Sequence, residues 1–529
     1  MKKLFILSLL SGLLLAAAWP TYGLPFLIFF GFLPLLIVEK KIRTSTEPRK
    51  WIRVLLYSYI SFVVWNTITT WWLWNSSVFG MFFAILVNAF LMAFVFSIFH
   101  FVARKLPAKI HLVFLPAIWI AFEKFHLNWP FSWPWLNLGN VFSEYYQWIQ
   151  WYEYTGVFGG SLWIWIVNIG VFRIWEKYLH TKNIKKVMKA AGIQLAWVIL
   201  PVIISLWMFA TYQNTGNTAT VIVLQPNVDP YTEKYERDNI ETVSELLSLT
   251  QVHDVTEIDF VIAPETTLSR MTPMDQFVFT REYALIRSLI DTHPKVNFLT
   301  GADMFRLYLQ SERPTPFANR TSRGDWADYF NTAVFIKKNA PPEFYIKSKL
   351  VVGVETLPFK NFLEPVLGNI MLDLGGTIAT RAIQENRTVF TSADGNYKAG
   401  PIICYESVYG EFVTEYIKEG ANFLAIITND GWWGTTQGHK QHLSYSRLRA
   451  IETRRSIARS ANTGISAIIN PKGEIVRSLG YNQKGSVMGE VTLNEKHTVY
   501  VKYGDYIARI AVLLSVLLLL FAIARKKQV

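Results

Sequence analysis

Long apolar stretches fill most of the first 211 residues, and one more lies near the end of the chain. They cover residues 4–18, 24–38, 52–73, 80–102, 110–125, 157–175, 190–211 and 506–524. A helix needs about 20 apolar residues to cross a bilayer, so the first, second and fifth stretches must tilt or be buried among their neighbours. The pattern predicts eight transmembrane α-helices, seven in a domain of residues 1–211 and one in a C-terminal segment of residues 501–529.

Residues 212–500 have a different pattern, in which short β-rich stretches alternate with amphipathic helical ones. We expect strands at residues 219–225, 259–263, 296–301, 330–336, 400–404, 422–428 and 466–470. We expect helices at residues 240–249, 274–291, 408–418 and 441–460. This alternation predicts an α/β domain whose sheets are covered on both faces. The insert 358–381 is apolar for a loop, and it fits either a lid that dips into the membrane or part of the core.

Composition and charge agree with a membrane protein. Hydrophobic residues make up 51% of the chain and charged residues only 17%, which is too apolar for an ordinary soluble protein. The net charge of +13 is concentrated at the termini and in alternate loops between the apolar stretches, where 20 Lys and Arg stand against three Glu. The positive-inside rule then predicts cytoplasmic termini and an outer, periplasmic location for residues 212–500 on a bacterial inner membrane. Because the basic charge follows membrane topology, we expect no nucleic-acid partner.

The first apolar stretch also resembles a signal peptide. Residues 4–18 follow Lys2 and Lys3 and end at Ala16–Ala18, a possible cleavage site. Cleavage would leave the alternation of charge starting with the wrong sign. The transmembrane interpretation is therefore favoured.

Cys404 is the only cysteine in the chain. It has no intrachain disulfide partner, and of the nine histidines only His439 and His442 are closely spaced, so we expect neither a metal nor a cofactor. The thiol comes where a predicted strand ends and a helix begins, which is a common place for a nucleophile. Free cysteines are also among the most buried residues, so packing in the core is the alternative.

Two charged residues are also expected at strand edges. Glu265 follows an apolar strand in Ile262-Ala263-Pro264-Glu265, and Lys347 precedes a second apolar stretch. Glu265 also fits a helix cap, and Lys347 fits a solvated charge. Together with Cys404 they form a possible active site, but the residues alone do not decide between these interpretations.

The order of these residues resembles the nitrilase superfamily of carbon–nitrogen hydrolases. The matching motifs are Pro264-Glu265, Lys347, Cys404-Tyr405-Glu406 and Thr428-Asn429-Asp430-Gly431-Trp432-Trp433-Gly434. When the membrane spans, residues 133–139, 329–332 and 447–462, and Glu355 are added, nearly the whole chain resembles the bacterial apolipoprotein N-acyltransferase family. The resemblance implies an αββα sandwich that carries a Glu, Lys, Cys triad.

Carried over residue by residue, the resemblance implies that Cys404 is the nucleophile, Glu265 the general base and Lys347 the cation beside the developing oxyanion. It further implies supporting roles for Asn331, Glu355, Tyr405 and Glu406, and substrate or lid roles for Tyr235, Trp135, Trp432 and Trp433. The chain departs from the family pattern at Val352–Val354 before Glu355, at Ala263 before Pro264, and at Tyr235, where the family usually has Trp. These departures affect the expected acyl pocket and leave the triad intact.

The implied reaction moves a fatty acyl chain from a membrane phospholipid, through a thioester on Cys404, to the N-terminal amine of a diacylglyceryl-cysteine apolipoprotein. The implied partners are the phospholipid donor, the apolipoprotein acceptor and the bilayer, and we expect a monomer. Water must be kept from the thioester, and we expect residues 359–381 with Trp432 and Trp433 to exclude it.

The aromatic loop 128–140 holds Pro130 and Pro134 and therefore is not expected to be a continuous helix. It fits an interfacial aromatic belt or a portal for lipid substrate, and Glu123 before it is interpreted as interfacial.

Two other functions stay open from the residues alone. One is a membrane-tethered amidase or nitrilase that acts on a small amide. The other is a transporter-like or receptor-like protein whose outer domain binds a ligand. Few charged residues lie inside the predicted spans, which argues against an ion pathway.

Overall fold

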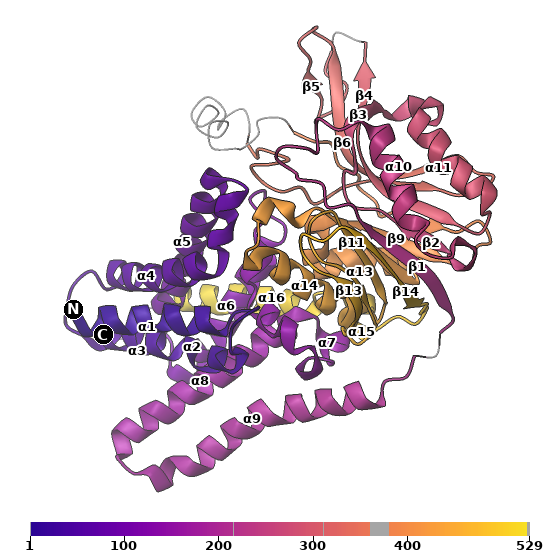
Figure 1. Ribbon diagram of the computed structural model, residues 1–529. Helices are drawn as coiled ribbons and strands as arrows, with labels where there is room; N and C mark the ends of the chain where they lie inside the picture. Colours follow the sequence, from indigo (N-terminus) through magenta and orange to yellow (C-terminus); the bar gives the residue numbers. More distant parts are fainter. Residues whose placement is uncertain (1, 215, 310–311, 360–379, 526–529) are drawn as a thin grey trace. The chain divides into compact units, whose positions relative to one another are not determined.

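The structure is a computed structural model that describes residues 2–214, 216–309, 312–359 and 380–525. The chain divides into two compact units (Figure 1). The helical unit comprises Met1–Trp71, Met81–Tyr212 and Tyr503–Val529, and the sheet unit comprises Trp72–Gly80 and Gln213–Lys502. Residues 72–80, which connect two predicted spans, thus group with the sheet unit.

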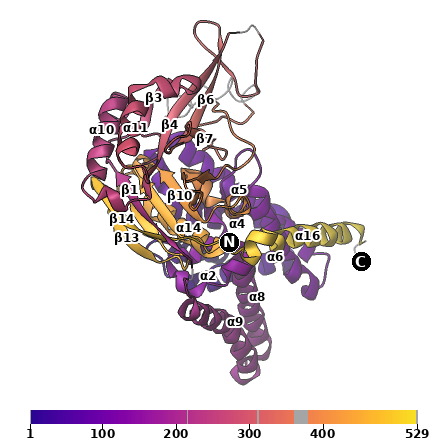
Figure 2. The ribbon, with the colours of Figure 1, turned by 90° about the vertical axis from the view of Figure 1, so that its right-hand side faces the viewer.

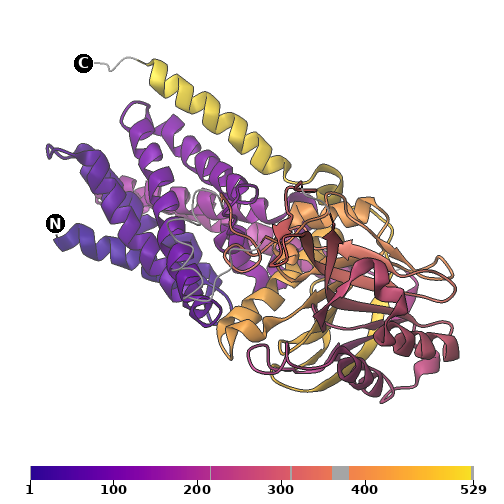
Figure 3. The ribbon, with the colours of Figure 1, turned by 90° about the horizontal axis from the view of Figure 1, so that it is seen from above.

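The helical unit contains helices at most of the predicted spans. These are α1 (Lys2–Ala18), α2 (Ile28–Gly31), α3 (Leu33–Thr44), α4 (Lys50–Thr70), α5 (Val78–Ala103), α6 (Ala108–His126), α7 (Tyr152–Thr155), α8 (Val157–Thr181), α9 (Ile184–Thr211) and α16 (Tyr506–Ala524). The C-terminal α16 packs on α6, and α1 packs on α4. Figure 3 shows α16, in yellow, alongside the helices of the N-terminal region.

Five helices in the described part of the chain are long and apolar enough to cross a membrane. They are Lys50–Asn75, Val78–Ala103, Val157–Thr181, Ile184–Thr211 and Tyr506–Ala524. α1 has only 17 residues, and α6 carries several charged side chains. These helices are those of a membrane protein, while the number of eight spans stays a prediction.

The predicted span at residues 24–38 is not one continuous helix. It divides into a 3₁₀ turn, η1 (Pro25–Leu27), followed by α2 and α3. Pro25 and Pro34 each stand at the start of a new helix, where a residue without an N–H is tolerated. The prolines therefore set the helix boundaries that hydrophobicity alone did not indicate.

Glu123 is buried inside the helical unit. Its carboxylate accepts hydrogen bonds from the backbone N–H of Leu138 at 2.7 Å and from Trp119 Nε1 at 3.2 Å. It thereby anchors the aromatic loop, which forms 3₁₀ turns at η3 (Pro134–Leu136) and η4 (Leu138–Trp148) rather than an α-helix.

The sheet unit contains two β-sheets. One has eight strands in the order β14-β1-β2-β4-β6-β5, with β3 paired to β4 and β7 to β6, and the other has six in the order β13-β12-β11-β10-β9-β8. The strands of the first are β1 (Thr218–Gln225), β2 (Phe260–Ile262), β3 (Leu268–Pro273), β4 (Asn297–Tyr308), β5 (Asn319–Arg320), β6 (Trp326–Ile336), β7 (Glu343–Ile346) and β14 (Gly485–Thr492). Those of the second are β8 (Phe390–Thr391), β9 (Lys398–Ile403), β10 (Phe423–Thr428), β11 (Ile457–Ala461), β12 (Ser466–Ile469) and β13 (Ile475–Leu479).

Helices cover the outer faces of both sheets. α10 (Asn239–Thr250) packs on β1 and α11 (Arg281–Thr292) on β4, whereas α13 (Gly410–Lys418) packs on β9 and α14 (Gln437–Thr453) on α13 (Figure 2). Between the sheets, the ring of Phe260 meets that of Phe423 at 5.1 Å, and Phe335 stacks on Phe390 at 5.0 Å. Strands buried on both faces explain the continuous apolar stretches in the sequence. The predicted α/β domain with covered sheets is confirmed.

Two of the predicted helices have different bounds. The stretch 441–460 is not one helix, because α14 ends at Thr453 and Arg454 has a left-handed φ of 51°. The residues that follow form β11, a buried strand between β10 and β12. Similarly, residues 274–279 form a 3₁₀ turn, and α11 begins only at Arg281.

Gly301 on β4 lets two backbone segments approach closely. A Cβ at this position would lie 2.3 Å from Thr266 N and 2.6 Å from Glu265 Cα. We expect Gly301→Ala to lower the stability by about 1–3 kcal/mol, because the turn that carries Glu265 must move. Thermal unfolding in detergent measures this loss. Gly192→Ala is the control, because no atom lies within 4 Å of its added Cβ; equal midpoints for the two variants would contradict the prediction.

Candidate active site

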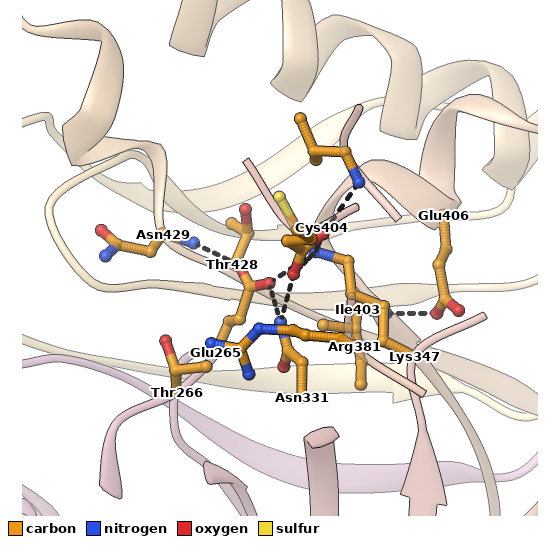
Figure 4. A network of polar contacts seen from close by, with 12 residues as sticks. Glu265, Thr266, Asn331, Lys347, Arg381, Ile403, Cys404, Glu406, Thr428 and Asn429 are labelled. Carbon is orange, nitrogen blue, oxygen red and sulfur yellow. Dashed lines mark hydrogen bonds and ion pairs between the residues drawn. The ribbon is translucent and has the colours of Figure 1, made fainter. Parts of the chain in front are cut away.

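The predicted triad comes from the ends of three strands. Glu265 follows β2 with only two residues between, Lys347 directly follows β7, and Cys404 directly follows β9. β2 and β7 belong to the eight-stranded sheet and β9 to the six-stranded one. The three side chains therefore come together from two facing sheets of one unit (Figure 4).

Lys347 is the centre of a buried cluster of charges, which we call the lysine cluster (Lys347, Glu265, Glu355 and Asn331). Its Nζ lies 2.9 Å from Glu265 Oε1 and 2.9 Å from Glu355 Oε2. Asn331 Nδ2 donates to both carboxylates, to Glu265 Oε1 at 2.8 Å and to Glu355 Oε1 at 3.0 Å. The lysine cluster thus joins two acidic side chains through one ammonium and one amide.

The charges in the lysine cluster stabilise each other. Burial alone would lower the pKa of Lys347, but the two carboxylates raise that pKa well above its ordinary value. Burial alone would raise the pKa of Glu355, but Lys347 and Arg381 lower it. An ammonium group is therefore present in the site at neutral pH.

Cys404 is a buried thiol in an unusual backbone conformation. Its φ is 52°, in the left-handed region that costs a residue with a side chain about 1–3 kcal/mol. Burial and the nearby Glu265 raise the pKa of the thiol above its ordinary value, while Lys347 and the adjacent Thr428 oppose this shift. These surroundings favour the thiol over the thiolate, so an attack by the Cys404 sulfur on a substrate would need a base.

Glu406 fixes the turn that Cys404 begins, η7 (Cys404–Val408), which we call the cysteine turn. The buried Glu406 carboxylate accepts hydrogen bonds from the backbone N–H groups of Ile403 at 2.8 Å and Ser348 at 2.7 Å, and from the Tyr345 hydroxyl at 2.7 Å. It therefore joins the cysteine turn to the segment that follows Lys347. Tyr405 is also buried, with its ring against Tyr409 at 5.3 Å.

The predicted substrate and lid residues are more scattered. Tyr235 is about half exposed, with the Lys234 ammonium 5.7 Å from its ring. Trp432 and Trp433 lie together in the turn η8 (Asp430–Trp433). Trp135 belongs to the helical unit, where it is buried and stacks on Trp133. The roles of these residues stay predictions.

Most of the predicted lid lies outside the described residues. Only residue 359 and residues 380–381 of the stretch 359–381 are described. Of these, Arg381 donates a hydrogen bond from Nη1 to Asp303 Oδ1 at 2.5 Å and is close enough to lower the pKa of Glu355.

Two cations near the site were not predicted from the sequence. They are Arg381 and Lys234. Lys234 is buried and donates to Thr266 Oγ1, directly after Glu265. Burial lowers the pKa of Lys234, and Asp303 and Glu265 partly oppose this effect. No sequence pattern distinguishes such a buried lysine from an exposed one.

The described residues contain no group of three or more His, Cys, Asp or Glu side chains that is placed to hold a metal ion.

Family models match both parts of the chain. A model described as the apolipoprotein N-acyltransferase N-terminal domain matches residues 11–170, and one described as carbon-nitrogen hydrolase matches residues 315–499. The chain is 28% identical over 541 residues to the apolipoprotein N-acyltransferase of Chlorobaculum tepidum, which covers 100% of this chain and 98% of the relative. The chain is therefore similar over its whole length to apolipoprotein N-acyltransferases.

Further similarities extend over both units. The apolipoprotein N-acyltransferase of Geobacter metallireducens is 26% identical over 520 residues, which cover 96% of this chain and 93% of the relative. A carbon-nitrogen hydrolase structure from Helicobacter pylori G27 covers 55% of this chain and 94% of its own, with a TM-score of 0.38 and 13% identity. The carbon-nitrogen hydrolase match includes Lys347 and Cys404, and Glu265 lies before it.

Replacing the central ammonium should destabilise the protein. Lys347→Met leaves the carboxylates of Glu265 and Glu355 buried together without their cation, which costs about 3–5 kcal/mol. Chemical denaturation in detergent measures the loss. The control is Arg306→Met, which breaks an exposed ion pair with Asp275 and should cost about 0–1 kcal/mol. Equal losses would contradict the buried arrangement.

The raised pKa of the Cys404 thiol predicts a pH dependence. Because the thiol stays protonated to higher pH than an ordinary cysteine, its alkylation by iodoacetamide should accelerate about tenfold per pH unit from pH 7 to 9 without a plateau. Intact-mass measurement reports the reaction of this single cysteine directly. A plateau reached below pH 7 would mean that the resting group is already a thiolate.

Proposed function

We propose that this protein is a membrane N-acyltransferase that moves a fatty acyl chain from a phospholipid, through a thioester on Cys404, to the N-terminal amine of diacylglyceryl-cysteine apolipoproteins. The observation that carries the proposal is the buried Cys404 thiol beside the lysine cluster. Similarity to apolipoprotein N-acyltransferases over the whole chain supports lipoprotein N-acylation as the overall reaction. The apolar helices support a membrane location that suits two lipid substrates.

The first step forms the thioester. The Cys404 thiol gives its proton to Glu265, and the sulfur attacks the carbonyl carbon of a phospholipid ester. The negative charge on the former carbonyl oxygen is stabilised by Lys347 Nζ and by the backbone N–H of Tyr405. The ester C–O bond then breaks, the lysophospholipid oxygen takes the proton from Glu265, and the acyl chain stays on sulfur.

The second step uses the same groups in reverse. The amine of the acceptor attacks the thioester carbonyl and loses a proton to Glu265. When the C–S bond breaks, the proton returns to the Cys404 sulfur and an amide is released. Since a buried carboxylate serves as base and then as acid, no external proton carrier is required.

The location and assembly belong to the same proposal. The alternation of basic loops supports an inner-membrane protein with its sheet unit in the periplasm. The chemistry requires one site only, so a monomer is sufficient. Trp432 and Trp433 follow β10 in the same unit as the triad, and we assign them to water exclusion around the thioester.

An acyl-enzyme assay tests the proposal. The purified protein is incubated with phosphatidylethanolamine, and its intact mass is measured. The wild type should gain one fatty acyl group, and Cys404→Ala should gain none. Glu265→Gln and Lys347→Ala should acquire the acyl group at least 10²-fold more slowly, because one lacks the base and the other an oxyanion donor.

The same assay separates the proposal from an amidase that acts on small amides. Such an amidase would show no fatty acyl mass on Cys404 with phospholipid. Loss of the adduct in the cysteine variant alone, with normal rates in the other two variants, would contradict the roles of Glu265 and Lys347.

A further inference from the structure

A second polar network contacts the backbone of the cysteine turn. His442 on α14 places Nε2 3.2 Å from the carbonyl oxygen of Cys404 and 2.9 Å from Ser407 Oγ. Ser407 Oγ itself donates to the Cys404 carbonyl oxygen at 2.8 Å. The carbonyl of the nucleophile is thus held by two side chains.

The proton on His442 can be assigned from these partners. The hydroxyl hydrogen of Ser407 is used toward the Cys404 carbonyl, so the oxygen of Ser407 presents a lone pair to Nε2. The Cys404 carbonyl oxygen is also an acceptor. A carbonyl oxygen can only accept, so the contact with Cys404 requires a proton on Nε2, while Nδ1 has Arg459 Nη2 as a donor 3.1 Å away.

The other side of the imidazole is fixed by a buried carboxylate. Asp430 Oδ1 lies 3.0 Å from His442 Nδ1, and Asp430 Oδ2 accepts from Arg459 Nη2 at 2.7 Å. Burial alone would raise the pKa of Asp430, but Arg459 and His442 lower it. Asp430 also accepts a hydrogen bond from Thr428 Oγ1 at 2.9 Å, so the carboxylate is charged and fully engaged.

Aromatic side chains fix the position of the His442 ring. Trp433 meets it edge to face, with ring centroids 5.5 Å apart, and Trp72 packs on Trp433 at 4.9 Å. Trp72 Nε1 donates to Gln441 Oε1 at 3.2 Å, and Asn75 Nδ2 donates to the Trp433 carbonyl at 3.0 Å. The segment between two predicted spans therefore supports the same histidine.

The peptide bond between Cys404 and Tyr405 connects this network to catalysis. A trans peptide is planar, so its C=O and N–H point in opposite directions. Hydrogen bonds to the Cys404 carbonyl therefore set the direction of the Tyr405 N–H and polarise it. They also hold the strained φ of Cys404, which persists only when its surroundings determine it.

We propose that His442 is a positioning residue which, by donating from Nε2 to the Cys404 carbonyl, aims the Tyr405 N–H at the oxyanion. The inference rests on the proposed function for the role of Tyr405. It extends that function to a histidine that touches neither substrate nor thiol. Asp430, Arg459 and Trp433 act through His442, since they hold its ring in place.

Two reactions of the single cysteine separate this role from a general structural one. Acylation by p-nitrophenyl butyrate forms an oxyanion, whereas alkylation by iodoacetamide does not. His442→Leu should slow acylation about 10- to 100-fold and change alkylation by less than about threefold. His442→Gln keeps an N–H donor at a similar position and should restore acylation to within about threefold of the wild type.

Two further variants serve as controls for the two rates. His439→Leu, on the same helix and stacked on Tyr481, should leave the ratio of the two rates unchanged. Ser407→Ala removes one of the two hydrogen bonds and should slow acylation about 3- to 10-fold, which decides the question if His442→Leu does not fold. Parallel loss of both reactions, equal effects of Leu and Gln at position 442, or normal acylation in Ser407→Ala and His442→Leu would overturn the inference. Because neither reagent is a lipid, the result does not depend on whether phospholipid is the donor.

Discussion

The site depends on the ion pairs that the ammonium group of Lys347 forms with two buried carboxylates. Two carboxylates, from Glu265 and Glu355, lie in a space that excludes water, and their mutual repulsion is tolerable only because one cation lies between them. Asn331 completes the arrangement with one amide. In the proposed reaction the same ammonium also stabilises the oxyanion. Stability and catalysis are therefore linked at one side chain.

The fold brings the thiol of Cys404 to this charge cluster from the opposite sheet. Glu265 and Lys347 follow strands of the eight-stranded sheet, and Cys404 follows a strand of the six-stranded one. Packing between the sheets therefore controls the approach of thiol to base. Glu406 fixes one side of the cysteine turn, and His442 with Ser407 fixes the other. The strained backbone of Cys404 is thus held from both sides, and residues adjacent to it in the sequence could not hold it alone.

The sequence predicted the residues of this site better than it predicted their environment. Polar residues directly after continuous apolar stretches pointed to Glu265 and Cys404 because buried strands have that pattern, and the family resemblance added the role of Lys347. Whether the three side chains come together depends on the order and register of the strands, which a run of apolar residues does not indicate. The end of α14 was missed because the buried strand β11 contains Arg459, whose charge is matched by Asp430 from another part of the chain. From the sequence, His442 was weighed only as a metal ligand. Its partners Asp430 and Ser407 are distant from it in the sequence, so no motif indicated the hydrogen-bond network that they form.

The transfer step is the most direct test of the account. The acyl-enzyme formed with phospholipid is separated from excess donor and then mixed with a synthetic diacylglyceryl-cysteine peptide, and the masses of protein and peptide are followed together. We predict that the acyl mass leaves Cys404 and appears on the N-terminal amine of the peptide at the same rate. Release of the chain as free fatty acid, or a protein adduct that persists in the presence of the peptide, would contradict a thioester intermediate in N-acyl transfer.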